Sequence, residues 1–440
     1  MAKISQIANS IEEVFDKKFI DNLARSQGFI QREVVVTGSG FVKTLVTSFQ
    51  ANKAASYSEM SACASSLGMP ITSQGIEQRF TKVSALFMRS VLEHALAIRV
   101  KGVDEQNVPL LNRFKAVHIR DSSIISLPLA LKDEWRGLGG NRGENSAMKL
   151  QVSWEQCSGN LDGITLQDGR CQDQSSPYQD MEMESGALHI ADLGYYSLEK
   201  LFSDGQKGVF WLSRLKYKTL LWDKEGKAID LLKFLTCQRQ DRLDIPVYVG
   251  ARRKIHCRLL AGRVPTAVAN QRKRHIKEQY RIKCLTPADE LLKLTEWTLV
   301  ITNVPASMLT FKEAFTLLKI RWQIELLFKL WKSHISIDQW TSQNPWRVLA
   351  EIYTKILIAV LFHWTMLADF WSFPDRSMVK AYKIFQHYSF SILSALEDKN
   401  SLMKILNNLS AVYIKSCRIS KHPNYACTFQ VLLNPDMVLC

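Results

Sequence analysis

The spacing of apolar residues changes twice along the chain, and these changes constrain its fold more than any other feature. Before residue 115, segments such as Ile11–Leu23, Gly40–Phe49 and Thr81–Ile98 repeat apolar residues three and four positions apart, as amphipathic helices do. From Ala116 short β-rich runs replace this pattern, and from Thr310 the helical period returns. The sequence therefore predicts an α/β protein in which a sheet forms between two helical regions.

The β-rich runs fall into two groups. The first group is Ala116–Arg120, Ser122–Leu127, Met148–Trp154, Gly163–Leu166 and Gly186–Ala191. The second group is Gly208–Leu215, Lys218–Trp222, Asp244–Val249, His256–Leu260 and Trp297–Asn303. The second group begins only after a short helical stretch that follows Tyr196, so we expect it to form a β-rich insertion.

The charge balance favours a polyanionic partner. The 440 residues include 57 Lys and Arg against 42 Asp and Glu, which gives a formal net charge of +15. Such an excess suits nucleic acid, and an anionic membrane surface also fits. With 46% hydrophobic residues, the chain can bury a core in two or three domains.

Neither a membrane span nor export is expected. The most apolar stretch, Ile356–Trp371, is interrupted by His363 and Asp369 and is shorter than a span, so we predict a core helix. The N-terminal segment lacks the uninterrupted apolar stretch of a secretory signal. Nine cysteines without a CxxC pair suggest reduced thiols in a cytoplasmic protein rather than a thiolate zinc site.

Two aspartates end apolar strand-like runs. Asp121 closes the run VHIRD, and Asp192 closes ALHIAD before the turn LGYYS. The ends of strands, next to turns, are where open α/β sheets place their chemistry. The alternative for each residue alone is a turn or helix cap.

A third carboxylate, Glu325, lies in a predicted helix over Leu317–Trp331. On a helical wheel Arg321, Glu325, Lys329 and Lys332 share a wedge of roughly 80°, while apolar residues fill the remainder. A solvated helix face produces such a stripe, and so does the floor of a groove. Two aspartates and a glutamate suit two Mg²⁺ ions about 4 Å apart, which cleave phosphodiesters by activating the attacking oxygen and stabilising the leaving one.

The motifs around these carboxylates resemble those of a known family. Arg321, Glu325 and Lys332 fit the spacing Tyr-x2-Arg-x3-Glu-x6-Lys, with Leu318 at the tyrosine position. The sequences DLGY at Asp192 and TNVP at Thr302 also look like the family pattern. The chain is similar in this way to the DDE transposases of bacterial insertion sequences, specifically the insertion-sequence-four family, over roughly residues 115–355.

This resemblance implies a fold, a cofactor and partners. It implies an RNase H-like (retroviral integrase-like) catalytic core at 113–200 and 309–372, interrupted by the β-rich insertion at 201–308. Residues 1–112 would then be a helical DNA-binding region, and 373–440 a C-terminal helical region for dimerisation. The family uses two Mg²⁺ ions, which Mn²⁺ can replace, held here by Asp121, Asp192 and Glu325. Its members bind terminal inverted repeats and target double-stranded DNA as a synaptic homodimer, with no membrane, in a cytoplasmic, nucleoid-associated location.

Further residues are expected to contact DNA. Through the resemblance these are Arg321, Lys329, Lys332 and Trp322, whereas Leu318 cannot make the tyrosine's hydrogen bond to phosphate. Trp297 is either the tryptophan that stacks on a flipped base or a strand-end core residue. The basic runs in the insertion form either a solvated face or phosphate contacts, and comprise Arg252, Arg253, Lys254, Arg272, Lys273 and Arg274. Two alternative functions stay open: a transposase-derived DNA-binding protein that does not cleave, and a metal-dependent nuclease without strand transfer.

Overall fold

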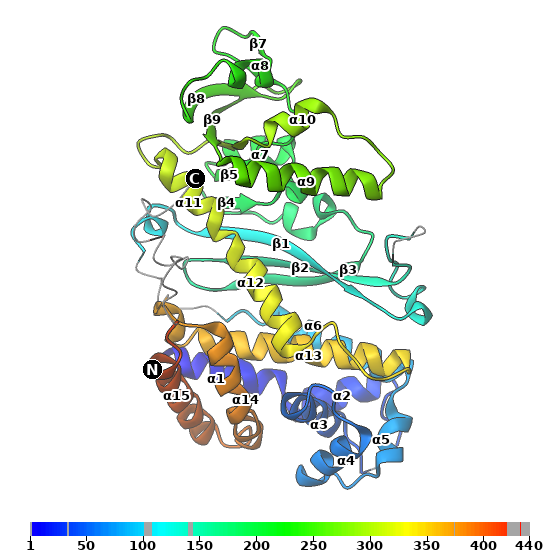
Figure 1. The fold of residues 1–440 in the computed structure, drawn as a ribbon. Helices are drawn as coiled ribbons and strands as arrows, with labels where there is room; N and C mark the ends of the chain where they lie inside the picture. The colour runs from blue at the N-terminus through cyan, green and yellow to red at the C-terminus, as the bar shows by residue number, and fades with distance from the viewer. Residues whose placement is uncertain are drawn as a thin grey trace. The chain divides into compact units, whose positions relative to one another are not determined.

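The computed structural model describes residues 2–32, 35–100, 108–139, 144–373, 375–419 and 432, shown in Figure 1. It is a mixed α/β protein with a large sheet, and helical segments come before and after the β-rich part of the chain. Two compact units interleave along the sequence: a first unit of Met1–Asn107, Ser122–Cys171 and Ile324–Ser420, and a second of Val108–Asp121, Gln172–Gln323 and Lys421–Cys440. The sequence predicted five consecutive functional segments, with boundaries after residues 112, 200, 308 and 372. This division stays a prediction.

The first unit is mainly helical. Its helices are α1 (Ala2–Val14), α2 (Lys17–Ser26), α3 (Gly38–Ala51), α4 (Tyr57–Ser66), α5 (Ser73–Arg79), α6 (Lys82–Ala97), α13 (Pro345–Met366), α14 (Met378–Ser394) and α15 (Lys399–Ser416). It also contains strands β2 (Ala147–Glu155) and β3 (Leu161–Asp168), the short helices η2 (Leu129–Leu131) and η7 (Phe370–Ser372), and the π-helix η6 (Trp331–Ile335). The expected C-terminal region 373–440 is described up to Ile419, apart from Pro374. Beyond Ile419 only Leu432 is among the described residues.

The second unit carries most of the strands. They are β4 (Leu188–Ala191), β5 (Phe210–Arg214), β6 (Leu221–Trp222), β7 (Ala228–Ile229), β8 (Arg242–Val249), β9 (Ile255–Arg263) and β10 (Trp297–Thr302). Its helices are η1 (Leu111–Arg113), η3 (Asp173–Ser175), η4 (Pro177–Gln179), η5 (Leu193–Tyr195), α7 (Leu198–Gln206), α8 (Leu231–Thr236), α9 (Thr266–Ile282), α10 (Asp289–Leu294) and α11 (Phe311–Ile320). Two elements, β1 (Val117–Ser126) and α12 (Trp322–Leu330), run from one unit into the other.

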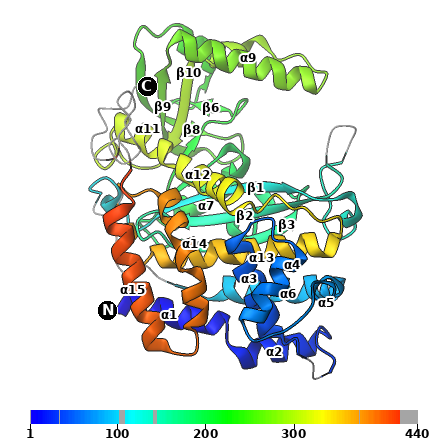
Figure 2. The ribbon, with the colours of Figure 1, turned by 60° about the horizontal axis from the view of Figure 1, so that its bottom comes forward.

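Helix α13 forms the core of the first unit. The side chain of Asn344 accepts hydrogen bonds from the backbone N–H groups of Trp346 and Arg347, which caps the helix start. Its residues are buried from Arg347 to Met366, and it packs against α3, α6 and α14 (Figure 2). By length and composition α13 could cross a membrane, but its apolar window is fully buried inside the protein. The prediction of a core helix is therefore confirmed, although the helix ends at Met366.

The predicted helical segment Ile11–Leu23 is helical, but a break divides it between two helices. Helix α1 ends at Val14 and α2 begins at Lys17. Between them Asp16 accepts a hydrogen bond from the backbone N–H of Phe19 at 2.6 Å and so caps α2. The apolar period continues across the break, so periodicity alone could not reveal it, whereas an aspartate before two lysines is an N-cap signal.

The hairpin of β2 and β3 turns at Gly159. Strand β2 is buried at every position and pairs antiparallel with β3. The carbonyl oxygen of Gly159 accepts hydrogen bonds from Trp154 Nε1 at 3.1 Å and from His363 Nε2 at 2.6 Å. Gly159 has φ of +79°, and a Cβ there would overlap the ring of Trp371. The turn thus requires glycine both for its backbone conformation and for this close approach.

We expect Gly159→Ala to lower the melting temperature of the protein clearly. A left-handed conformation costs about 1–2 kcal/mol for a residue with a Cβ, and the overlap with Trp371 adds to this cost. Gly68→Ala is the matched control, because Gly68 has φ of +77° but no other atom lies within 4 Å of the position that its Cβ would take. Equal losses of stability in the two variants, measured by thermal unfolding, would contradict the packing role of Gly159.

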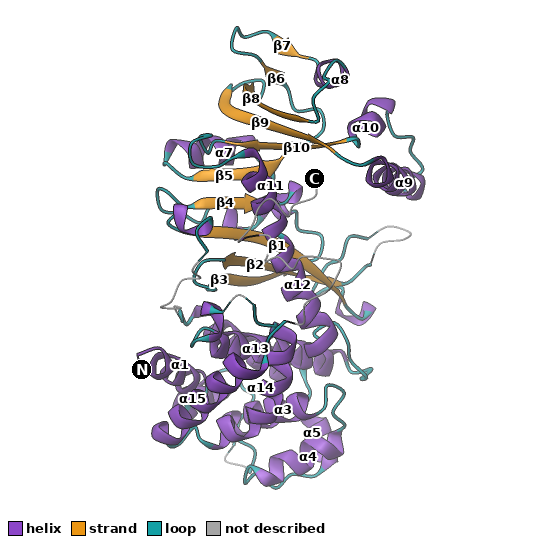
Figure 3. Cartoon of the chain, turned by 60° about the vertical axis from the view of Figure 1, so that its left-hand side comes forward, coloured by secondary structure: helices purple, strands orange, loops and turns teal. Residues whose placement is uncertain are grey.

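The sheet of the second unit begins with three parallel strands. The first half of β1 pairs in parallel with β4, and β4 pairs in parallel with β5. Strand β10 is antiparallel to both β5 and β9, and β8 is antiparallel to both β9 and β6. The order within this unit is β1-β4-β5-β10-β9-β8-β6-β7 (Figure 3).

Two sequence predictions need correction in the β-rich part of the chain. The runs Ala116–Arg120 and Ser122–Leu127 form one strand, β1, so Asp121 lies inside a strand rather than at its end. Residues 266–282, where no strand or helix was predicted, form α9. Only Ala269 of α9 is buried, so this helix lacks the apolar stripe by which the sequence would have revealed it.

Candidate active site

Asp121, within β1, and Asp192, directly after the neighbouring strand β4, occupy adjacent positions. The parallel register of β1 and β4 ends with the pair Arg120↔Ala191. Asp121 directly follows Arg120, and Asp192 directly follows Ala191. Adjacent strands lie about 4.8 Å apart, so both carboxylates start from neighbouring backbone positions. Asp192 precedes the turn η5, yet its side chain makes no capping hydrogen bond to it. The capping alternative therefore does not describe Asp192.

One arginine joins the two carboxylates. Arg321 Nη1 donates a hydrogen bond to Asp121 Oδ2 at 3.4 Å, and Arg321 Nε lies 3.7 Å from Asp192 Oδ1. The side chains of Arg321 and Asp121 are 15% and 17% exposed, whereas that of Asp192 is 39% exposed. The guanidinium offsets the repulsion between two half-buried negative charges, and both carboxylates reach a single cation.

The predicted helix Leu317–Trp331 is wrong as a single element. Helix α11 ends at Ile320 and α12 begins at Trp322, with Arg321 between them. After Leu330 the chain forms the π-helix η6, which ends at Ser336 in the left-handed conformation, with φ of +61°. A π-turn adds a residue to the helical repeat and shifts later side chains around the axis. Lys332 therefore lies in the π-helix and not in the regular α-helix on which the wheel was drawn.

The signature residues have different surroundings. Glu325 is half-buried in the first turn of α12, four residues after Arg321. Lys332 Nζ donates to the carbonyl oxygen of Ile124 at 2.7 Å, while Lys329 is exposed. Trp322 is 54% exposed and Leu318 is 9% exposed. In the part of the chain that the structure describes, no group of three or more His, Cys, Asp or Glu residues is arranged to hold a metal ion.

The basic residues of the insertion divide into exposed and internal ones. Arg252, Arg253 and Lys254 lie in the exposed turn between β8 and β9. Arg253 stacks over Phe202 at 4.8 Å, and Lys254 over Trp222 at 4.1 Å. These cation–π contacts orient the two cations while leaving them accessible to solvent.

Helix α9 presents one arginine inward and one outward. Arg272 donates to Thr298 Oγ1 at 3.0 Å and to the carbonyl oxygens of Thr295 and Trp297. Its pKa is lowered, first by burial and then by the charge of Arg214. Lys273 pairs with Glu296 at 2.9 Å, and Arg274 is exposed. Arg272 thus fastens α9 to β10 in this structure, whereas Arg274 faces solvent.

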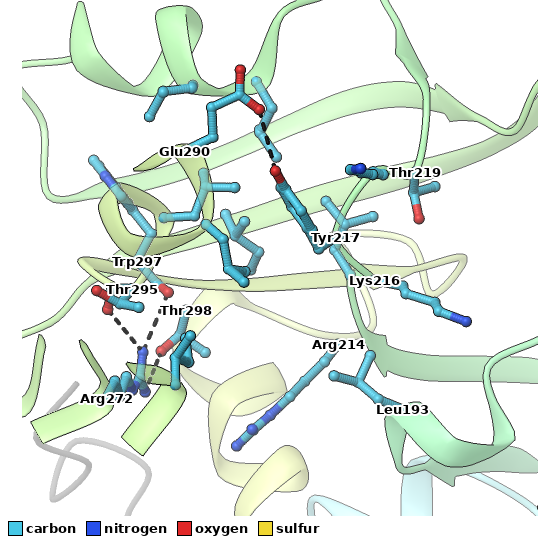
Figure 4. Close-up of a pocket in the computed structure, with 18 of the residues that line it drawn as sticks. Leu193, Arg214, Lys216, Tyr217, Thr219, Arg272, Glu290, Thr295, Trp297 and Thr298 are labelled. Atoms are coloured by element: carbon cyan, nitrogen blue, oxygen red, sulfur yellow. Dashed lines mark hydrogen bonds between the residues drawn. The ribbon is translucent and has the colours of Figure 1, made fainter. Parts of the chain in front are cut away.

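Trp297 lines a cavity of about 730 Å³ in the second unit. Its side chain is 7% exposed and lies under the guanidinium of Arg263 at 4.7 Å, as the core alternative predicts. Figure 4 shows Arg272 reaching Thr298 and its neighbours on one side of the cavity, and Tyr217 reaching Glu290 at 3.3 Å on another. The lining comes from several separate segments, so no local sequence pattern could have indicated this cavity.

The strand histidine beside Asp192 is not suited to act as a base. His189 is buried, and its pKa is lowered to about 4, first by desolvation and then by the charge of Arg120. Its Nδ1 lies 3.8 Å from Asp204 Oδ2, and Lys200 Nζ lies 2.9 Å from the other oxygen of that carboxylate, Oδ1. His189 is therefore neutral near pH 7 and buried, as expected for a core histidine.

Two adjacent carboxylates that reach one cation suit a hard divalent metal. Mg²⁺ prefers oxygen ligands and binds through one or two carboxylates together with substrate phosphates. The partial exposure of Asp192 leaves room for such a substrate beside the pair. This arrangement suits the cleavage or transfer of a phosphodiester.

Comparisons with a family model and with known proteins all find transposases. Residues 112–361 match the family described as "Transposase DDE domain". The transposase for insertion sequence element IS231F of Bacillus thuringiensis subsp. israelensis is 24% identical over 92% of this chain and 90% of the relative. The transposase for IS1151 of Clostridium perfringens is 25% identical over 86% of this chain and 82% of the relative. The putative transposase InsL for IS186A of Escherichia coli K12 is 23% identical over 60% of this chain and 69% of the relative.

Proposed function

The chain belongs to the transposase DDE domain family, and from this we propose that it binds the terminal inverted repeats of its own element and catalyses Mg²⁺-dependent DNA cleavage and strand transfer. The family consists of polynucleotidyl transferases and nucleases, so the chain is a transposase-class enzyme that acts on DNA. The inverted repeats, the metal and the cut-and-paste course are the parts that we propose.

The observation that carries the proposal is the pair Asp121 and Asp192 joined by Arg321. The register of β1 and β4 brings the two aspartates together, and the guanidinium contacts both. We propose Glu325 as the third carboxylate, because it follows Arg321 by four residues, about one helical turn. This spacing matches the signature of the family that the sequence resembles.

The chain's own residues would have three tasks. Asp121, Asp192 and Glu325 would hold two Mg²⁺ ions, or Mn²⁺ in their place, which supply an activated oxygen nucleophile and a stabilised leaving oxygen. Arg321 would turn from the aspartates toward a phosphate, because a guanidinium matches phosphate oxygens in a bidentate way. Lys329, Lys332 and Trp322 would position the DNA strand beside the carboxylates.

We propose an RNase H-like core for the catalytic part of the chain. The parallel strands β1, β4 and β5 and the hairpin of β2 and β3 support this proposal. Because β5 pairs with β4, the core would reach past residue 200 before the insertion begins. Within that insertion, Arg252, Arg253, Lys254, Lys273 and Arg274 would contact DNA phosphates, while Arg272 and Trp297 would need to leave their internal contacts first.

The partners and the remaining segments follow from the same proposal. Residues 1–112 would bind the element ends, and 373–440 would support a homodimer that holds two ends together. Free thiols at all seven cysteines in the described residues agree with a reducing compartment, and we propose that the protein acts in the cytoplasm near the bacterial nucleoid.

The test combines purified protein and Mg²⁺ with a plasmid that carries both ends of the element. Excision together with a joined product supports the proposed function. Binding without cleavage would indicate a transposase-derived DNA-binding protein, an outcome to which Leu318 at the tyrosine position draws attention. Cleavage without joining would indicate a nuclease.

A further inference from the structure

Three lysines from distant segments of the first unit lie close enough to His334 for their charges to act on it. Lys53 follows α3, Lys383 lies on α14, and Lys329 and His334 lie on α12 and η6. We call these four residues the Lys53 cluster. Lys329 and Lys383 are exposed, whereas Lys53 and His334 are half-buried.

Hydrogen bonds and packing hold these three segments together. Gln386 Nε2, one turn after Lys383, donates to the carbonyl oxygen of Gln50 at 3.2 Å, close to Lys53 in the chain. Lys355 of α13 donates to the carbonyl oxygen of Gln339, just after η6, and lies 5.4 Å over the ring of Phe49 on α3. The end of α3 is therefore fixed beside both α14 and the segment that follows η6.

The positive charges in the Lys53 cluster are not neutralised by nearby acids. Among the described residues, none of the four has a carboxylate within 4.0 Å. The pKa of His334 is lowered, first by burial and then by Lys53, Lys383 and Lys329, and the pKa of Lys53 is lowered by burial and by Lys383. The acids Glu351 and Asp338 act to raise the pKa of Lys355, whereas the charge of Lys53 acts to lower it. Crowded cations of this kind raise the energy of the folded protein until an anion approaches.

We propose that the Lys53 cluster binds backbone phosphates of DNA, so that the N-terminal and C-terminal helical regions form one composite DNA surface on the unit that carries Glu325. This inference rests on the proposed function and adds to it Lys53, Lys383 and His334, which no motif marks, beside Lys329. Lysine ammonium groups are point charges on flexible stems, so the cluster positions the duplex and does not read its bases.

The test is the double variant Lys53→Ala/Lys383→Ala of the full chain. Its matched control is Lys404→Ala/Lys415→Ala, which removes the same charge from exposed positions of α15. Binding is measured against salt for a duplex that carries one element end and for a scrambled duplex of equal length. We expect the slope of log K against log salt to become shallower by about 2 for both duplexes in the double variant, and to stay unchanged in the control.

A second measurement reports on the Lys53 cluster itself, through the ionisation of His334. We expect the pKa of His334, measured by NMR, to rise when either duplex is added, because phosphates offset the charges of the three lysines. An unchanged salt slope in the double variant, or an equal change in the control, would overturn the inference. Binding to anionic phosphatidylserine vesicles is measured in parallel. A double variant that loses vesicle binding but keeps DNA binding would also overturn the inference. If the double variant binds like the wild type and both give excision and joining, only this inference fails. If the wild type neither binds nor cuts, the proposed function fails.

Discussion

Replacement of Asp192 by Asn is expected to lower the rate of DNA cleavage by a factor on the order of 10³ or more, because metal-ion charge stabilisation is worth several kcal/mol and each 1.36 kcal/mol is tenfold in rate. Asn keeps the size of the side chain but loses the negative charge that we propose to hold the cation. Asp121→Asn and Glu325→Gln should have effects of the same order. Single-turnover cleavage of end-containing duplex at saturating Mg²⁺ measures this rate.

DNA binding separates a catalytic effect from a folding defect. All three variants should bind end-containing duplex about as well as the wild type, because they remove no positive charge. Asp180→Asn is the matched control, since Asp180 is exposed after η4 in the unit that contains Asp121 and Asp192. Full cleavage activity in any of the three carboxylate variants would remove that residue from the site.

The second large effect concerns the stability of the first unit. Lys355 and Glu351 form an ion pair at 2.6 Å inside α13, with side chains 1% and 0% exposed. Burial raises the pKa of Glu351 and lowers that of Lys355. Removing one partner leaves a buried charge without compensation, which costs about 3–5 kcal/mol. We therefore expect Lys355→Met to lower the denaturation midpoint strongly.

The double variant Lys355→Met/Glu351→Gln tests the cause. It removes both charges while nearly preserving volume, and such replacements are often neutral or stabilising. We expect it to recover most of the stability that the single variant loses, as measured by urea or thermal denaturation. A double variant less stable than Lys355→Met would show that packing or the hydrogen bond from Lys355 to Gln339 dominates instead.

The sequence predicted features that depend on local pattern. Asp192 closes an apolar run before a turn, and the structure has it there, directly after β4. The apolar stretch Ile356–Trp371 was predicted as a core helix because polar residues interrupt it and it is too short for a span, and its residues up to Met366 lie in the buried helix α13. Asp121 was placed at a strand end because it falls between the runs Ala116–Arg120 and Ser122–Leu127, yet both runs belong to the continuous strand β1. A polar residue in a buried strand cannot be distinguished locally from a strand end.

Features that depend on tertiary contacts were not predictable. Arg272 looked like part of a solvated basic run, but it donates three hydrogen bonds to the segment Thr295–Thr298, far along the chain. The break at Arg321 interrupts a stretch that reads as one apolar helix, and the contacts of Arg321 with Asp121 and Asp192 become visible only in the fold. The Lys53 cluster likewise joins residues hundreds of positions apart, which no motif connects.

Direct measurement of divalent cation binding tests the central claim, that Asp121, Asp192 and Glu325 hold the catalytic metal. Electron paramagnetic resonance counts the Mn²⁺ bound by the full chain in complex with an end-containing duplex. We predict about two Mn²⁺ ions per chain for the wild type, as the two-metal mechanism requires, and clearly fewer for Asp192→Asn and Glu325→Gln. The same Mn²⁺ stoichiometry and affinity in wild type and both variants would contradict the account.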